Sequence, residues 1–201
     1  DDTFLYINQS FGFNRSIGLA MMLDGKLWRG VEGRSGRIGH MVIDPNGPQC
    51  ECGQHGCWRV MTSDETELQH AIDALRSGKN SSLQVFSEKD YCELTVDEIH
   101  MAAIHGDDLA QEVLKQRVEY TELAISNLIN IFDPGVVITA YSFTTINKPD
   151  IYTIMVGMGN VVKQIMKELP LNPNAERRHA KNGTSAVLLG AASMLLEEFM
   201  N

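Results

Sequence analysis

One histidine and three cysteines lie close together in the first third of the chain. They are His40, Cys50, Cys52 and Cys57. Thiolates and a neutral imidazole are the donors that usually hold a structural zinc ion in a tetrahedral Cys₃His site. Gly53 and Gly56 lie between the cysteines and allow the tight turns that three nearby thiols need to converge. The pattern therefore predicts a zinc knuckle over residues 40–57.

A disulfide is the competing interpretation of these cysteines. Three clustered cysteines would leave one unpaired, and the chain shows neither a second pair nor a secretory signal. The fourth cysteine, Cys92, lies apart and is expected to be a buried or half-buried thiol. His55 lies between the cysteines but is expected to be an exposed spacer, because a four-coordinate site closes without it. The sequence favours zinc.

Composition is that of an ordinary globular protein. The 201 residues are 43% hydrophobic and 21% charged, which suits one substantial α/β domain. A net charge of −9 makes this chain a poor candidate for gripping a nucleic-acid backbone by itself. No apolar run approaches the roughly 18 residues that cross a bilayer, so we expect a cytoplasmic protein with no membrane partner.

The first element of the chain starts almost at once, with no initiator methionine. An apolar strand over residues 4–8 follows Asp1, Asp2 and Thr3. We therefore expect a fragment that begins within a longer protein.

Alternating and continuous apolar runs predict a mixed sheet. Strands are expected over residues 4–8, 17–23, 40–43, 136–139 and 175–179. Asp24-Gly25 predicts a tight hairpin after the second of these. The run 136–139 is short, β-branched and continuous, as in a buried parallel strand.

Apolar residues at helical spacing predict the helices. Thr62 with Glu65 and Thr95 with Glu98 have the spacing of capping boxes. The first helix is expected to end near Gly78, with a loop over 78–90. Further helices are expected over 95–105, 107–132, 151–166 and 184–199. Helices packed on a mixed sheet indicate an α/β or α+β domain.

The knuckle and its flanks resemble the signature of the ROK family of bacterial sugar kinases and sugar-responsive repressors. The family pattern is Gly-Glu-x-Gly-His, then Cys-x-Cys-Gly-x-x-Gly-Cys-x-Glu. This chain reads Gly36-Arg37-Ile38-Gly39-His40, then Cys50-Glu51-Cys52-Gly53-Gln54-His55-Gly56-Cys57-Trp58-Arg59. Segments 94–107, 127–134 and 189–192 resemble the Mlc and NagC repressor branch in particular.

The resemblance implies the second half of an actin-like, ribonuclease-H-like fold. It also implies that His40, Cys50, Cys52 and Cys57 hold structural zinc, and that His40 lies beside a sugar. The departures are Arg37 and Arg59, which replace the two glutamates that bind sugar hydroxyls in the family. A carboxylate accepts hydrogen bonds, whereas a guanidinium only donates them.

Two interpretations of this exchange stay open. In one, Arg37, His40 and Arg59 bind an anionic ligand such as a sugar acid or sugar phosphate, for which arginine forks are suited. In the other, ligand binding has lapsed, and the arginines lie on the surface or pair with acidic neighbours.

A sugar kinase is the alternative function. The family's second phosphate loop should fall near Ser10–Gly18, where this chain has the bulky residues Phe11, Phe13 and Arg15. Segment 140–143 carries Tyr141 and Phe143, where the family has small residues near the adenosine site. Bulky side chains obstruct the close approach of backbone to phosphate, so no catalytic residue is assigned.

The sequence thus predicts, over residues 1–201, the effector-sensing and oligomerisation domain of a ROK-type repressor. The expected partners are a second or further copies of the chain in a dimer or tetramer, and a carbohydrate-derived effector. Operator DNA would bind only through an N-terminal winged helix-turn-helix that this chain lacks. A third hypothesis is a degenerate scaffold that keeps zinc and binds no ligand.

Overall fold

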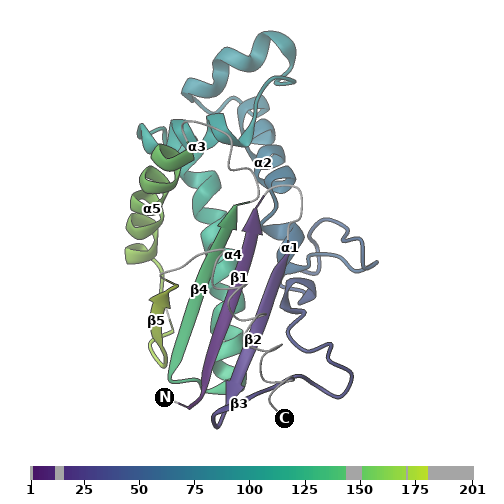
Figure 1. Cartoon of the computed structure of the whole chain (residues 1–201). Coiled ribbons are helices and arrows are strands. Elements are labelled where there is room, and N and C mark those ends of the chain that lie inside the picture. Colours follow the sequence, from purple (N-terminus) through teal and green to yellow (C-terminus); the bar gives the residue numbers. More distant parts are fainter. Residues whose placement is uncertain (1, 12–15, 144–150, 171, 181–201) are drawn as a thin grey trace. The chain divides into compact units, whose positions relative to one another are not determined.

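The computed structural model describes residues 2–11, 16–143, 151–170 and 172–180 (Figure 1). They fall into two compact units. The first unit comprises Asp1–Gly39, Ile129–Ile146 and Pro173–Asn201, and the second comprises His40–Leu128 and Asn147–Asn172. The helix expected over 184–199 lies outside the described residues.

The first unit is built on a five-stranded sheet in the order β3-β2-β1-β4-β5. The strands are β1 (Phe4–Phe11), β2 (Ile17–Leu23), β3 (Lys26–Leu27), β4 (Val136–Phe143) and β5 (Glu176–His179). β1 pairs antiparallel with β2 and parallel with β4, and β4 pairs parallel with β5. Figure 1 shows β2, β1 and β4 side by side, so the predicted mixed sheet is confirmed.

The alternation of β1 explains why it lies at the centre of this sheet. Leu5 and Ile7 are fully buried, and Leu5 lies level with Met21 of β2 and Val137 of β4. Burying a side chain of this size contributes roughly 1.5–3 kcal/mol. The turn Asp24-Gly25 joins β2 to β3 with both residues in the left-handed region, at φ values of 50° and 73°, as the sequence predicts.

The second unit is helical. Its helices are α1 (Trp58–Met61), α2 (Asp64–Arg76), α3 (Val96–Ile104) and α5 (Ile151–Glu168), with most of α4 (Asp108–Phe132). Their core includes Leu75, Ile99, Leu114 and Ile165. A Cβ on Gly157 would lie 2.7 Å from Cδ1 of Ile104. This glycine, which weakens the intrinsic propensity of α5, therefore lets α5 approach α3 closely.

Two expectations about short elements are wrong. Residues 40–43 are not a strand: Ile38–His40 form a single 3₁₀ turn, η1, and only Val42 makes an isolated bridge, to Cys57. The expected loop 78–90 contains a 3₁₀ helix, η2 (Ser82–Lys89), which begins where the Ser81 hydroxyl accepts a hydrogen bond from the Leu83 amide. A side-chain cap at Ser81 marks the start of η2, and the spacing of apolar residues does not reveal such a cap.

Asp107 holds the start of two helices at once. Its carboxylate accepts a hydrogen bond from the Ala110 amide of α4 at 3.0 Å and from the Ser82 amide of η2 at 2.7 Å. The hydroxyls of Ser81 and Ser82 also donate to it. Partial burial raises the pKa of Asp107, but these hydrogen bonds outweigh burial and hold its pKa below the usual value.

Replacing Asp107 with Asn should therefore lower the free energy of unfolding by about 1–2 kcal/mol at pH 7. Because the folded pKa is depressed, the contribution of Asp107 is present above the unfolded pKa of about 3.9 and lost as pH falls through the folded pKa. Urea denaturation at pH 7 and near pH 3 measures this difference.

Asp108→Asn is the matched control. It removes the same charge from the same helix terminus, but Asp108 is exposed and takes no part in the hydrogen bonds of Asp107. An equal loss of stability in both variants would show that helix-dipole charge alone accounts for the effect.

Candidate metal centre

His40 and the three clustered cysteines converge in the second unit. One ligand atom from each of the four residues can be chosen so that all lie within 4.8 Å of one another. The Cys50 sulfur lies 3.6 Å from Nδ1 of His40, and the Cys52 sulfur lies 3.5 Å from that of Cys57. Cys50 and Cys57 are buried, whereas Cys52 is exposed. The donor set and its spacing fit a metal ion.

Backbone hydrogen bonds produce this convergence. Two isolated antiparallel bridges, Val42 with Cys57 and Gln49 with His55, fold the segment back on itself. The Gly56 carbonyl accepts from the Ile43 amide, and the Gly56 amide donates to the Pro48 carbonyl, both at 2.9 Å. His55 is exposed, and it lies outside the metal-type group. Its predicted exposure is confirmed, and its Nδ1 lies 3.1 Å from the Gly47 carbonyl oxygen.

Gly53 and Gly56 both lie in the left-handed region, at φ values of +89° and +65°. Their surroundings differ. A Cβ on Gly56 would lie 1.4 Å from the Asp44 carbonyl oxygen, whereas a Cβ on Gly53 would meet nothing within 4 Å. Gly56 is therefore required by both its backbone conformation and its packing, and Gly53 by conformation alone.

The electrostatics of the thiols depend on their burial. Burial, with the neighbouring Cys52 and Cys50 thiols, raises the pKa of Cys57 to about 12. The backbone amide of Gln54 lowers the pKa of the exposed Cys52. A divalent cation supplies the positive charge that a buried thiolate needs, because a coordinating thiol is deprotonated outright.

The knuckle leads directly into α1. The Cys57 thiol donates to the His40 carbonyl at 3.4 Å, and the Trp58 amide donates to the Met41 carbonyl at 2.8 Å. Trp58 is fully buried. Residues 40 and 41, at one end of the knuckle, are therefore hydrogen-bonded to Cys57 and the buried Trp58 at the other end, where α1 begins.

The start of α2 is capped by a different residue from the one that the sequence predicts. Ser63, not Thr62, is the cap of α2, and its hydroxyl accepts from the Thr66 amide at 3.2 Å. The Thr62 hydroxyl donates back to the Trp58 carbonyl at 3.0 Å, and that of Thr66 donates to the Val60 carbonyl at 2.6 Å. The predicted box of Thr62 with Glu65 is wrong because the turn of α1 already engages Thr62.

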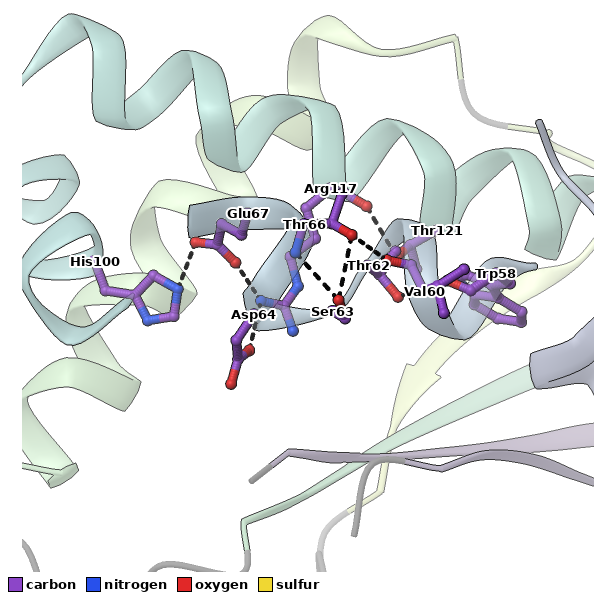
Figure 2. A network of polar contacts seen from close by, with 10 residues as sticks. All are labelled: Trp58, Val60, Thr62, Ser63, Asp64, Thr66, Glu67, His100, Arg117 and Thr121. Carbon is purple, nitrogen blue, oxygen red and sulfur yellow. Dashed lines mark hydrogen bonds and ion pairs between the residues drawn. The ribbon is translucent and has the colours of Figure 1, made fainter. Parts of the chain in front are cut away.

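A buried carboxylate joins α2 to α3 and α4 (Figure 2). Glu67 is 3% exposed, forms an ion pair with Arg117, and accepts from Nε2 of His100 at 2.8 Å. Arg117 also lies 3.5 Å from an oxygen of Asp64. Burial raises the pKa of Glu67, but the charge of Arg117 and the contacts with His100 outweigh it, so the pKa is lowered.

The two predicted ligand-binding arginines belong to different units. Arg37 is exposed in the first unit, immediately before η1. Arg59 is in α1 of the second unit, where 23% of its side chain is exposed and it forms an ion pair with Glu51. The Glu51 side chain is 69% exposed and lies between two of the clustered cysteines in sequence.

Other predicted positions have mixed outcomes. Cys92 is exposed, so the expectation of a buried or half-buried thiol is wrong. It occupies the turn after η2, in a segment where Tyr91 and Leu94 take the buried positions. Residues 140–143 continue β4 as a strand paired with β1. Phe13 and Arg15 of the expected phosphate loop lie outside the described residues.

The sheet order, the helical unit and the metal-type cluster define a mixed α/β protein of the actin-like class. Two solved structures share the fold. A ROK family transcriptional regulator, a homologue of the Escherichia coli MLC protein, has a TM-score of 0.61 and 24% identity over 89% of this chain and 42% of its own. The ROK hexokinase from Thermus thermophilus has a TM-score of 0.64 and 24% identity over 98% of this chain and 59% of its own.

Residues 3–198 match the ROK family, and the chain therefore belongs to it. The xylose repressor of Bacillus subtilis is 28% identical over 200 residues, which are 100% of this chain and 46% of that relative. The chain spans less than half the length of the curated relatives it matches first. Among the described helices, none is long and apolar enough to cross a membrane.

Gly56→Ala should destabilise the knuckle more than Gly53→Ala does. Each substitution strains a left-handed backbone, at a cost of about 1–2 kcal/mol. Only alanine at Gly56 also collides with the Asp44 carbonyl. Thermal unfolding of both variants measures the difference, with Gly53→Ala as the matched control. Equal melting temperatures would contradict the packing argument.

Proposed function

We propose that this chain is the effector-binding and oligomerisation part of a sugar-responsive ROK transcriptional repressor. The observation that carries the proposal is the match to a xylose repressor along the whole chain. Because the fold is shared with a ROK hexokinase, the fold alone does not separate a regulator from a kinase. The bulky residues at both expected nucleotide-contacting segments favour the regulator.

We propose further that the cluster binds one structural zinc ion through His40, Cys50, Cys52 and Cys57. Three sulfur donors and one imidazole suit tetrahedral zinc better than magnesium or calcium, which prefer oxygen ligands. Two of the sulfurs are buried, which also suits a closed structural site. The ion would cross-link a segment in which, between Met41 and Gly56, only Cys50 and Gly56 are buried, so that metal binding contributes folding free energy.

For the effector, we propose a carbohydrate-derived anion that engages His40 and Arg59 of the second unit; Arg37 belongs to the first unit and stays a sequence-based expectation. Nδ1 of His40 is the nitrogen nearest the Cys50 sulfur, so a metal on Nδ1 leaves Nε2–H to donate to a ligand oxygen. Arg59 is largely buried but ends at an exposed carboxylate, Glu51. An anionic ligand group could replace that carboxylate, because the Glu51 side chain is mostly exposed to solvent.

The mechanism proposed is a population shift. The effector would bind one arrangement of the subunits in a dimer or tetramer better than another, and so change operator affinity by a coupling free energy. DNA would be read by an N-terminal winged helix-turn-helix. The alternative is a ROK sugar kinase, for which the shared fold with the hexokinase is the favouring observation.

If the zinc proposal holds, the protein should contain one zinc ion per chain, and a chelator should lower its melting temperature. Cys52→Ser should weaken zinc binding by more than the roughly 10–100-fold expected for an outer-shell partner. Cys92→Ser is the matched control, since Cys92 is exposed and outside the cluster. Competition with a chromogenic chelator measures both affinities, and equal affinities would remove Cys52 from the site.

For the effector, full-length, zinc-replete protein should be stabilised by sugar phosphates or sugar acids and not by neutral sugars. A ligand at 100 times its dissociation constant adds about 2.7 kcal/mol. Arg59→Glu should abolish this stabilisation, because the charge of the site is reversed. Arg34→Glu, which reverses the charge of an exposed arginine paired with Glu32, is the control. Thermal-shift series measure the effect.

The same ligand should change the affinity of the full-length protein for DNA upstream of its own gene. Fluorescence anisotropy with labelled DNA measures this change. Sugar-dependent ATP hydrolysis with no DNA binding would overturn the repressor proposal in favour of the kinase. DNA binding that no sugar derivative alters would leave a repressor without the arginine-based effector site.

A further inference from the structure

We propose that Cys52 and Cys57 form a reversible disulfide when a peroxide oxidises the knuckle, so that the metal site is also a redox-sensitive modification site. The proposal goes beyond the repressor function and needs no effector. It rests on the relative positions and the unequal exposure of the three clustered thiols.

The sulfurs of Cys52 and Cys57 lie 3.5 Å apart. A disulfide bond is about 2.05 Å long, so closing it requires a movement of about 1.5 Å. Cys50 lies 3.6 Å from Nδ1 of His40, and its thiol also interacts with those of Cys52 and Cys57. A bond between Cys50 and Cys52 would close a ring over a single intervening residue and distort the preferred dihedral angle of the disulfide.

The exposures of the sulfurs assign the two roles in the reaction. Cys52 is exposed, whereas Cys57 is fully buried and Cys50 is 3% exposed. A small oxidant therefore reaches Cys52 first. Cys57 lies behind it, inaccessible to the oxidant but in contact with the sulfur that is oxidised. This is the arrangement of an attacked thiol beside a resolving thiol.

The chemistry balances with one hydrogen peroxide per disulfide. The Cys52 thiolate attacks one peroxide oxygen, the O–O bond breaks, and a sulfenic acid and hydroxide form. The sulfur of the Cys57 thiol then attacks the sulfenic sulfur, the S–O bond breaks, and the thiol proton leaves with that oxygen as water. With the two thiol protons, the products are one disulfide and two water molecules. The sulfurs lose two electrons, and the peroxide gains them.

Oxidation would remove two of the four candidate ligands in one step. His40 and Cys50 alone cannot close a four-coordinate zinc site. Glu51, the ion-pair partner of Arg59, lies between Cys50 and Cys52 in sequence. A disulfide from Cys52 to Cys57 would therefore also move the loop that presents this carboxylate. A reducing thiol would reverse the change by thiol–disulfide exchange.

The test maps the disulfide in wild-type protein, so that it does not depend on a variant that folds. Trypsin cleaves after Arg37 and Arg59 and nowhere between, which places all three clustered cysteines in one peptide, residues 38–59. Full-length protein is stripped of metal with a chelator and treated with hydrogen peroxide. It is then denatured, labelled with N-ethylmaleimide, digested and analysed by mass spectrometry.

The expected peptide is two hydrogens lighter and carries one label in place of three. Backbone cleavage between Cys50 and Cys52 falls outside the expected ring, so the fragments should place that label on Cys50. A reducing thiol should restore all three labels, Cys52→Ser should abolish the linkage, and Cys92→Ser should leave it intact. A label on Cys52 or Cys57, three surviving thiols, or added oxygen without a linkage would overturn the proposal.

A second arm repeats the treatment on zinc-loaded protein with a chromogenic chelator present. Zinc should appear in proportion to the disulfide. Zinc loss with all three thiols intact, or a disulfide in protein that keeps its zinc, would overturn the coupling. If the protein binds no zinc at all, the zinc proposal fails, and the metal-free arm still decides the disulfide.

Discussion

The contact between Gly56 and the Asp44 carbonyl is the constraint on which the metal-type site depends. With its left-handed backbone and no space for a Cβ, Gly56 accepts from Ile43 and donates to Pro48. These bonds fix the direction in which the chain leaves the knuckle, and hence the position of Cys57. The next residue, Trp58, is fully buried. The packing of Gly56 against Asp44 therefore helps to determine where α1 begins.

The buried charges carry that position into the helical unit. Glu67 would be costly to bury alone, but Arg117 and His100 from two other helices provide compensating contacts. Removing one partner would leave an uncompensated buried charge, whereas a well-packed apolar replacement of all three could be as stable. The network therefore connects α2 to α3 and α4 at one buried point without being evidence of a large net stabilisation. Asp64, the first residue of this network in the chain, follows Val60 of α1 by four residues, and the Val60 carbonyl accepts a hydrogen bond from the Thr66 hydroxyl.

The sequence predicted well whatever depends on neighbours in the chain. The convergence of His40 with the three cysteines, the Asp24-Gly25 hairpin and the capping box of Thr95 with Glu98 are all confirmed. It failed where a distant or competing contact decides. Thr62 has cap spacing, but the Trp58 carbonyl takes its hydroxyl. Glu67 lies 33 residues from His100 and 50 from Arg117. No periodicity in a single sequence indicates such a pairing, because all three occupy ordinary helical positions.

The ion pair between Arg59 and Glu51 joins α1 to the loop that carries the candidate metal ligands Cys50 and Cys52. Its two ends are unequal: the arginine is held by burial, whereas the carboxylate is exposed on the loop that also carries Cys50 and Cys52. A change in this loop would therefore move the exposed acceptor, Glu51. An anion that displaces Glu51 would meet a guanidinium already in place, and so would lose little side-chain entropy on binding. Arg59, which stands where the family pattern has a glutamate, would then be open to an anion only when the knuckle moves Glu51 away from it.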